Sequence, residues 1–476
     1  MAHRRILSPS VPELDFAAIR TELEIPGPFP APVLAAAEQA ARAAQPPGSS
    51  DRLDATNVEF VTIDPPGSMD LDQAVAIETL DAGGWRVRYA IADVASWVVP
   101  GGPIDQEARR RTQTYYAPDT RTPLHPPALG EDAASLLPDG PRPAVLWTID
   151  VAADGTTTKI DVRRALVQSR AQLTYAQVQA DLDAGTAPAA IQAFPALGAA
   201  LLADARRRQS IELGLPEQEV SQGPDGRWTV SLRADLAIEQ WNAQVSLLTG
   251  RAAASLMLGA GIGLLRTLPT PDPAQFPRLQ RAATSLGIAW PDGAHPGDVL
   301  ASLDTSLPRH AAFADLAAEL LRGAAYTAFD GPAPLDPGHA GVGAPYAHVT
   351  APLRRLVDRF ATEICLAISA GLDVPTWARE AIPELPALMA AGDSRSRKLD
   401  RAIVDATEAF VLVRRVGDIF PAAVVETGEK FGSVAVDELA VRARCDSRDL
   451  PLGEEIRVRC TVADVAARSV RFERVT

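Results

Sequence analysis

Cysteine is rare in this chain of 476 residues, and long apolar runs are missing. The three cysteines, Cys365, Cys445 and Cys460, are odd in number and far apart. They argue against a disulfide framework or a cysteine zinc site and favour a reducing compartment. The most apolar stretch, Ser255 to Leu265, is about half as long as a membrane-spanning helix, and the first residues hold no apolar run of signal-peptide length. We therefore expect a cytoplasmic monomer that does not bind membranes.

Positive charge is also in short supply. The chain has 46 Lys and Arg residues against 60 Asp and Glu, a net charge of −14. This balance argues against a protein that coats nucleic acid non-specifically, but an enzyme can enclose a basic channel in an acidic shell. Only Lys159, Lys398 and Lys430 are lysines. Arginine suits bidentate phosphate contacts, although a GC-rich coding sequence is the simpler explanation of this bias.

The length corresponds to about three domains of roughly 150 residues. Residues 15–24 and 32–44 are alanine- and leucine-rich with helical spacing, and a Pro-Pro-Gly-Ser-Ser segment follows them. From Thr174 to about residue 415 the pattern is again mostly helical. Between these regions, alternating apolar residues predict strands at 58–63, 74–80, 85–94, 145–151 and 157–165.

The last 56 residues change character. Short alternating segments are separated by turns, and about five strands can be counted, among them 422–427, 432–436, 455–462 and 469–475. This pattern suits a small five-stranded OB-like barrel, a fold that often binds single-stranded nucleic acid. A β-domain without a ligand fits the periodicity equally well.

One segment, Ile63 to Ala74, carries a chemically informative pattern of carboxylates. Asp64 ends an apolar strand, Pro-Pro-Gly predicts a turn, and Asp70 and Asp72 then alternate with apolar residues, so that both face one side of an extended segment. Three adjacent carboxylates repel one another, and Mg²⁺ relieves that repulsion while keeping places for water and phosphate. Two such ions can activate water against a phosphodiester. Taken as spacing alone, the pattern is more often a solvated acidic loop.

Further motifs follow, and together they resemble the ribonuclease II / ribonuclease R family. The RNB catalytic domain of that family opens with TIDxxxxxDxDDA, here Thr62 to Ala74. The segment Tyr346 to Asp358 resembles its YAxxTSPIRRYxD element. Between them, the resemblance continues through Ala90 to Val94, Asp105 to Pro118, Pro123 to Leu136 and Gln172 to Val178. The last 56 residues resemble the OB domain, of the ribosomal S-one kind, that ends the family's chains.

The resemblance implies an α+β fold in three parts. Residues 1–56 would form a small helical domain in place of the family's cold-shock domains. Residues 57–415 would form the RNB domain, a mixed sheet with helices around an RNA channel, and residues 416–476 a five-stranded OB barrel. The implied activity is that of a 3′→5′ exoribonuclease. It would degrade single-stranded RNA from a free 3′ end to nucleoside 5′-monophosphates, using one or two Mg²⁺ ions, with Mn²⁺ as an alternative cation.

The resemblance also assigns roles to residues. Asp64, Asp70 and Asp72 would hold Mg²⁺ and the attacking water, and Arg354 would stabilise charge at the scissile phosphate. Tyr116 and Tyr175 would stack on the last bases. The remaining RNA contacts implied are Gln244, Tyr346, Thr350, Arg355 and Phe431.

Two departures from the family pattern concern this site. Gln73 stands at a fourth acidic position, and as a metal ligand it would offer a neutral carbonyl, so one Mg²⁺ should be held more weakly. Gln244 falls where the family carries a Glu-Glu pair, although its amide could still bond a 2′-hydroxyl. These changes keep two alternatives open: a non-catalytic RNA-binding protein, and a metal phosphodiesterase with another substrate. The retained Asp64, Asp70, Asp72 and Arg354 favour the active nuclease, and the OB-like segment and the paired tyrosines favour RNA.

Overall fold

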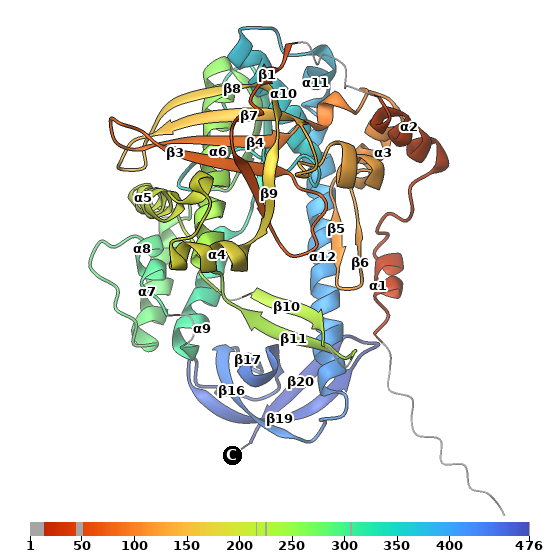
Figure 1. Ribbon diagram of the computed structural model, residues 1–476. Helices are drawn as coiled ribbons and strands as arrows, with labels where there is room; N and C mark the ends of the chain where they lie inside the picture. Colours follow the sequence, from red (N-terminus) through yellow and green to blue (C-terminus); the bar gives the residue numbers. More distant parts are fainter. Residues whose placement is uncertain (1–13, 44–50, 216, 224–225, 305–306, 476) are drawn as a thin grey trace, which may run out of the picture.

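The computed structural model describes residues 14–43, 51–215, 217–223, 226–304 and 307–475 (Figure 1). Its centre is a seven-stranded mixed sheet in which the first and last strands run parallel to their neighbours and the others are antiparallel. In sheet order the strands are β1 (Leu53–Asp54), β8 (Thr157–Val167), β7 (Arg142–Val151), β4 (Trp85–Ala92), β3 (Gln73–Thr79), β2 (Phe60–Asp64) and β9 (Ser169–Thr174). With a separate five-stranded barrel at the other end, the molecule has the α+β architecture that the sequence predicts.

Both faces of the large sheet are buried, because alternate side chains of its central strands point to opposite sides. Tyr89 and Trp147 pack into one core, and Ala90 and Leu146 pack into another. The first core is covered by α4 (Tyr175–Ala184), α5 (Phe194–Arg207), α6 (Ala237–Ala260), α10 (Leu356–Ala370) and α11 (Thr376–Ala381), and the second by α2 (Ala31–Ala41) and α3 (Pro103–Arg111).

The region from 174 to 415 contains strands that its helical pattern did not predict. Gly261, with a φ of +72°, ends α6 and turns the chain into β12 (Ile262–Thr267), which pairs with β13 (Ala325–Asp330). An apolar run can form a strand or a buried helix, and tertiary pairing decides between them here. The other strands of the region are β10 (Glu217–Gln222) with β11 (Trp228–Arg233) and β14 (Gly338–His339) with β15 (Ala344–Pro345).

The first two helices do not share a core. Phe16 and Ile19 of α1 (Phe16–Glu22) pack against a long helix near the end of the chain, whereas Val33 and Ala37 of α2 pack beneath the large sheet. Residues 53–54 already pair with β8, so the sheet begins before the boundary expected at residue 57. Within the described residues 14–43, the segment expected as one small helical domain consists of two helices that pack against different parts of the molecule, and the rest of that expectation, at 1–13 and 44–50, lies outside the described residues.

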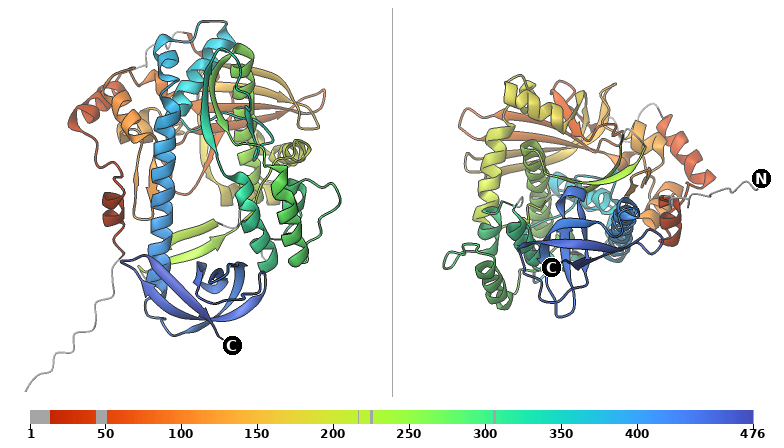
Figure 2. Two further views of the ribbon diagram at one scale, coloured as in Figure 1. Left: turned by 180° about the vertical axis from the view of Figure 1, so that it is seen from behind. Right: turned by 90° about the horizontal axis from the view of Figure 1, so that it is seen from below.

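The long helix α12 (Leu385–Leu412) connects the sheet to the barrel, as Figure 2 shows from behind. The barrel is closed in the order β16-β17-β18-β20-β19, as expected for an OB fold. Its strands are β16 (Ile419–Glu426), β17 (Gly432–Val436), β18 (Val441–Cys445), β19 (Glu455–Asp464) and β20 (Ser469–Arg474). Three further helices pack on its other side, α7 (Phe276–Ser285), α8 (Pro296–Ala301) and α9 (Pro308–Ala317).

No single helix in the described part of the chain is long and apolar enough to cross a membrane. Two segments, Tyr175–Ala184 and Ala189–Arg207, reach the necessary length and apolar composition only when they are counted together, and a 94° bend separates them. The three cysteines are buried and unpaired.

Candidate active site

The aspartate segment lies where β2 turns back into β3. Asp64 is the last residue of β2, and Gly67 adopts a φ of +79° in the turn that follows. The returning chain is fixed by buried contacts: the hydroxyl of Ser135 accepts from the Leu71 N–H at 3.0 Å and donates to the Met69 carbonyl at 2.6 Å. These bonds hold the segment extended without using either of its carboxylates.

Asp72 joins the aspartate segment to a loop nearly 300 residues later. It is 2 % exposed. One of its carboxylate oxygens accepts from the Leu353 N–H and the other from Nε of Arg354, both at 2.7 Å. Burial raises the pKa of Asp72 to about 6, although the charge of Arg354 opposes this rise. The paired carboxylate thus sets the direction of Arg354, whose side chain is still 41 % exposed and can reach a ligand.

The loop that carries Arg354 is held from within. Asp358, fully buried in α10, accepts from the Ala351 N–H at 2.7 Å and forms a two-bonded ion pair with Arg355. The Thr350 hydroxyl lies 2.9 Å from that of Ser246. Arg355 therefore serves the loop's structure, and its predicted RNA contact has no direct support in this geometry.

Asp64 differs from its two neighbours because its Oδ2 is buried and has no hydrogen-bond partner. Burial, followed by the charge of Asp72, raises its pKa to about 7. Asp70 also acts on Asp64 electrostatically, while its Oδ1 accepts from Nη1 of Arg121 at 2.8 Å. An unpartnered buried carboxylate oxygen beside two further carboxylates fits a hard divalent cation.

Asp70 and Asp72 nevertheless already accept hydrogen bonds from protein donors. Across the described residues, no group of three or more His, Cys, Asp or Glu side chains is arranged to hold a metal ion. Asp72 uses both oxygens on the loop of Arg354, and Asp70 uses one on Arg121. The donor set fits Mg²⁺ or Mn²⁺ chemically, but at least one internal bond must be exchanged for a metal contact.

Gln73 does not have the setting of a metal ligand. Its Nε2 donates to the Thr350 carbonyl at 2.6 Å, and its Oε1 accepts from the Tyr89 hydroxyl at 2.9 Å. Both ends of the amide therefore bind protein groups. Its place among the metal ligands is corrected to that of an amide that joins β3 to the Arg354 loop.

Two tyrosines border the aspartates from different elements. Tyr116, in the hairpin of β5 (Tyr115–Ala117) and β6 (Thr120–Thr122), is 48 % exposed and hydrogen-bonds to Arg354. Tyr175 begins α4; its hydroxyl accepts from Asn242 at 3.3 Å and is close enough to Asp64 for the two charges to interact. Both tyrosines therefore lie beside the aspartate segment, and their predicted stacking on RNA bases stays a prediction.

Three predicted RNA contacts lie in the interior. Gln244 is 4 % exposed and donates to Glu212, and the ring of Tyr346 packs against Gly250 in a position that a Cβ there would occupy. Thr350 is also buried. Burial in protein contacts leaves these three no free surface for RNA, so their predicted role is replaced by a structural one. Phe431, on the barrel, remains 45 % exposed, with the Arg444 guanidinium 3.8 Å from its ring centre.

Sequence reasoning missed Arg121, which binds Asp70. The signal was available in the hairpin, because Tyr116 and Arg121 are cross-strand partners about the turn at Pro118 and Asp119. A side chain opposite a predicted site residue on a two-stranded ribbon lies on the same face. Arg121 therefore belongs to the same group as Asp70, Tyr116 and Arg354.

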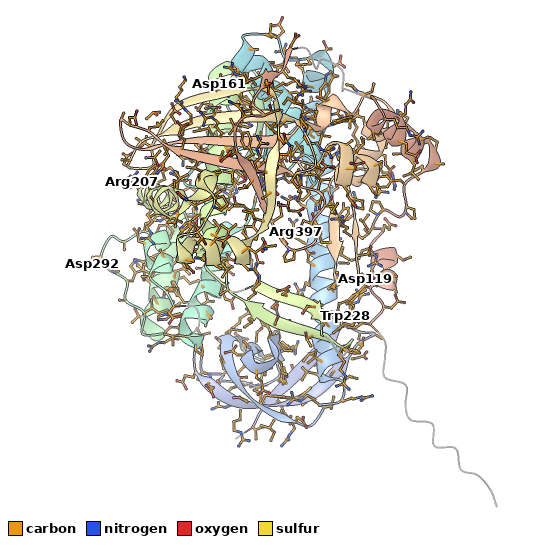
Figure 3. The ribbon with its side chains drawn as sticks, viewed as in Figure 1. Asp119, Asp161, Arg207, Trp228, Asp292 and Arg397 are labelled. Carbon is orange, nitrogen blue, oxygen red and sulfur yellow. The ribbon has the colours of Figure 1, made fainter. Side chains whose placement is uncertain are left out.

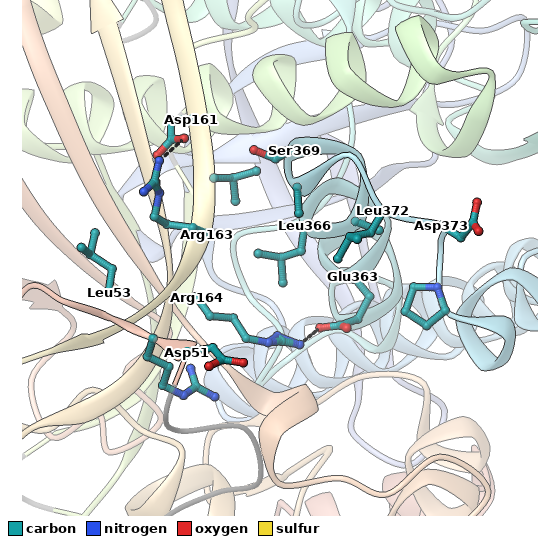
Figure 4. A pocket seen from close by; sticks show the side chains of 15 residues that line it. Asp51, Leu53, Asp161, Arg163, Arg164, Glu363, Leu366, Ser369, Leu372 and Asp373 are labelled. Carbon is teal, nitrogen blue, oxygen red and sulfur yellow. Dashed lines mark hydrogen bonds and ion pairs between the residues drawn. The ribbon is translucent and has the colours of Figure 1, made fainter.

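A pocket of about 810 Å³ lies elsewhere, between β8 and α10 (Figure 4). Its polar lining is made of internal ion pairs, Arg164 with Glu363 and Arg163 with Asp161. None of the aspartates discussed above lines it. The pocket is therefore separate from the aspartate site.

Known proteins share sequence similarity with most of this chain. Residues 52–368 match the family model of the RNB domain, and residues 418–475 match that of the RNase II-type exonuclease C-terminal S1 domain. The chain is 25 % identical to ribonuclease R of Thermotoga maritima over 444 residues, which cover 89 % of this chain and 61 % of that protein. The chain spans 61 % of the length of that ribonuclease R and 40 % of the length of a second curated relative. In both comparisons the match covers most of this chain.

Solved structures show the same fold. The structure of Mycoplasma genitalium RNase R in complex with ribose methylated single-stranded RNA matches with a TM-score of 0.84 at 19 % identity, over 97 % of this chain and 77 % of that one. Yeast Ssd1, described as a pseudonuclease, matches with a TM-score of 0.67 at 15 % identity, over 86 % of this chain and 52 % of that one. The shared fold thus occurs both in an RNase and in a protein described as a pseudonuclease.

Proposed function

Because the chain belongs to the RNB-domain family, we propose that it is an exoribonuclease that degrades single-stranded RNA from its 3′ end with the help of a divalent cation. The products would be nucleoside 5′-monophosphates. The observation that carries the proposal is the unpartnered oxygen of Asp64 beside Asp72, with Arg354 bound to Asp72 and half exposed.

Asp64, Asp70 and Asp72 are the residues that would hold the cation. When bound, it would lower the pKa of an attacking water and neutralise charge on the scissile phosphate. Arg354 donates from a fixed direction, since Asp72 holds Nε and leaves the two Nη groups for a phosphate oxygen. Such a preoriented donor stabilises the charge that grows in the transition state more than it stabilises bound substrate.

RNA specificity follows from the aromatic side chains around this cluster. Tyr116 and Tyr175 border the carboxylates, and Phe431 with Arg444 offers a further stacking surface on the barrel. Bases of any identity stack on such rings, so we expect little sequence preference. The single-stranded RNA bound by Mycoplasma genitalium RNase R supports the same class of substrate here.

A gel assay tests the proposal. Poly(A) labelled at its 5′ end is incubated with the protein in the presence of Mg²⁺, Mn²⁺ or EDTA. We expect a ladder that shortens from the 3′ end with either metal and no change in EDTA. A 3′-phosphate-blocked RNA and the variant Asp72→Asn serve as controls.

The second candidate is an RNA-binding protein without catalysis. Gln73 and Gln244 favour it, because both are neutral and both bind only protein groups, and the fold also occurs in a pseudonuclease. Undegraded RNA that is still retained by the wild-type protein in a filter-binding assay, with both metals present, would support this candidate over the nuclease.

A further inference from the structure

Arg121 has the contacts of a counter-ion in the aspartate cluster. Its Nη1 donates to Oδ1 of Asp70 at 2.8 Å, and its Nη2 lies 2.9 Å from Oε2 of Glu131. All three side chains are largely shielded from water, with exposed fractions of 29 %, 14 % and 24 % for Arg121, Asp70 and Glu131. Partial burial makes these pairs stronger than ordinary surface ion pairs.

The guanidinium reaches Asp70 from a separate element. Arg121 lies in β6, directly opposite Tyr116 of β5, whose hydroxyl bonds to Arg354. The hairpin therefore presents one aromatic ring and one cation to the carboxylates. Its turn, which contains Asp119 (Figure 3), is tied on the outside to Arg20 of α1.

Charge in the cluster is almost balanced without a metal. Three carboxylates face two guanidinium groups, and both oxygens of Asp72 are already bonded. Arg121, the cationic partner of Asp70, has a second acceptor. Glu131 already binds the other end of its guanidinium and can hold it when it leaves Asp70. Arg121 occupies Oδ1 of Asp70 and places a positive charge beside that carboxylate, so it opposes the binding of a cation there.

We propose that Arg121 is a displaceable counter-ion that sets the divalent-cation affinity of the site, with Glu131 holding the guanidinium once Asp70 is given up. The inference rests on the proposed use of a divalent cation. In the metal-free protein Arg121 neutralises Asp70 and holds the hairpin near Arg354. When the cation takes Asp70, the guanidinium shifts toward Glu131 and remains beside the site.

Two substitutions should change metal affinity in opposite directions. Arg121→Gln removes the competitor and should tighten Mn²⁺ binding about tenfold, the scale expected for a shielded, hydrogen-bonded ion pair. Glu131→Gln leaves Arg121 with Asp70 alone and should weaken Mn²⁺ binding roughly threefold. Arg121→Lys keeps the charge and should stay within about twofold of wild type.

Each substitution has a control of matched charge. Arg20→Gln removes an arginine bound to the same hairpin at Asp119, away from Asp70. Asp132→Asn removes a carboxylate next to Glu131 in the chain, whose nearest cation is Arg142 at 3.7 Å. Neither control should move the Mn²⁺ affinity by more than about twofold, since Arg20 binds Asp119 and not Asp70, and Asp132 is exposed so that its charge is screened.

The measurement is Mn²⁺ binding to the RNA-free full chain by calorimetry and by the loss of the free Mn²⁺ paramagnetic signal. Tighter binding by Arg121→Gln with weaker binding by Glu131→Gln supports the proposal. Equal affinity in wild type and Arg121→Gln overturns it and leaves the metal-dependent function standing. No binding by any of the proteins would overturn both. Should Arg121→Gln not fold, the comparison of Glu131→Gln with Asp132→Asn decides, and equal affinities of those two would overturn the proposal.

Discussion

Asp72 combines two tasks in one side chain, since it is a predicted ligand and also the acceptor that orients Arg354. Asp72→Asn should lower hydrolysis at saturating RNA by about 10³-fold or more, because it removes both a negative ligand and the charged partner of Arg354. RNA binding should survive or tighten, as phosphates then meet less negative charge. Single-turnover rates and filter binding measure the two effects, with Asp119→Asn as a control. Wild-type turnover in Asp72→Asn would contradict the metal-site assignment.

Arg354 and Arg355 are neighbours with different expected phenotypes. Arg354→Ala should lower kcat by roughly 10²- to 10³-fold with little change in RNA affinity, because the lost donor acts mainly in the transition state. Arg355→Ala leaves Asp358 buried without its ion pair and should cost about 3 to 5 kcal/mol of unfolding free energy. Kinetics and urea unfolding of both variants test this contrast. A normal kcat with only a raised KM in Arg354→Ala would make it a binding residue.

Which residues meet at the site was partly predictable. Asp64, Asp70 and Asp72 could be placed together because a strand, a turn and an extended return are local features of the chain. The amide of Gln73 could not be assigned, because its partners Tyr89 and Thr350 come from a neighbouring strand and a distant loop. Spacing shows which face a side chain takes and does not show what will be packed against that face.

At the scale of elements, α12 carries a buried titratable group where helix, hairpin and barrel meet. Glu408 accepts from the Arg442 N–H of the barrel and from Gln218 of β10, each at 2.9 Å. Burial raises its pKa from 4.5 to about 7. The folded protein therefore binds more protons than the unfolded chain between these values, and its stability falls as pH rises from about 4.5 to 7.

Glu408→Gln should remove this dependence, because the amide oxygen can accept the same bonds without a charge. We expect the variant to gain about 1 to 3 kcal/mol of unfolding free energy over wild type at pH 8 and almost nothing near pH 5. Urea unfolding at both pH values measures the difference. Glu438→Gln, exposed on the barrel, is the control. A gain that is equal at the two pH values would show that Glu408 does not titrate as stated.

Element prediction failed where pairing is remote. The strands from 58 to 165 were predictable because hairpin neighbours alternate clearly, and β3, β4, β7 and β8 pair in sequence order. β12 follows α6 without a polar break and finds its partner β13 about 60 residues later. Local composition cannot distinguish such a strand from the end of a buried helix.

At the scale of the whole molecule, we expect Phe431 of the barrel to provide a second contact for RNA. Phe431→Ala should raise the KM for long RNA by about 5- to 100-fold, the loss expected for one stacked base, with kcat unchanged. Steady-state kinetics on a long poly(A) and on a pentanucleotide measure this, and the pentanucleotide should respond less. Val416→Ala, another exposed apolar residue, is the control. An equal effect on both RNAs would place Phe431 outside the substrate path.

The single helix between sheet and barrel has a consequence for how digestion ends. α12 contributes Leu385 and Met389 to the core of the sheet and Ala409 and Leu412 to that of the barrel, and its 28 residues run without a break. Such a helix is about 42 Å long and stiff. If the barrel binds RNA as proposed, this helix fixes the distance between that contact and the aspartate cluster, so a shortening strand should leave the barrel at a fixed number of nucleotides. The length of α12, a helix that does not touch the scissile bond, would then set the size of the last fragment.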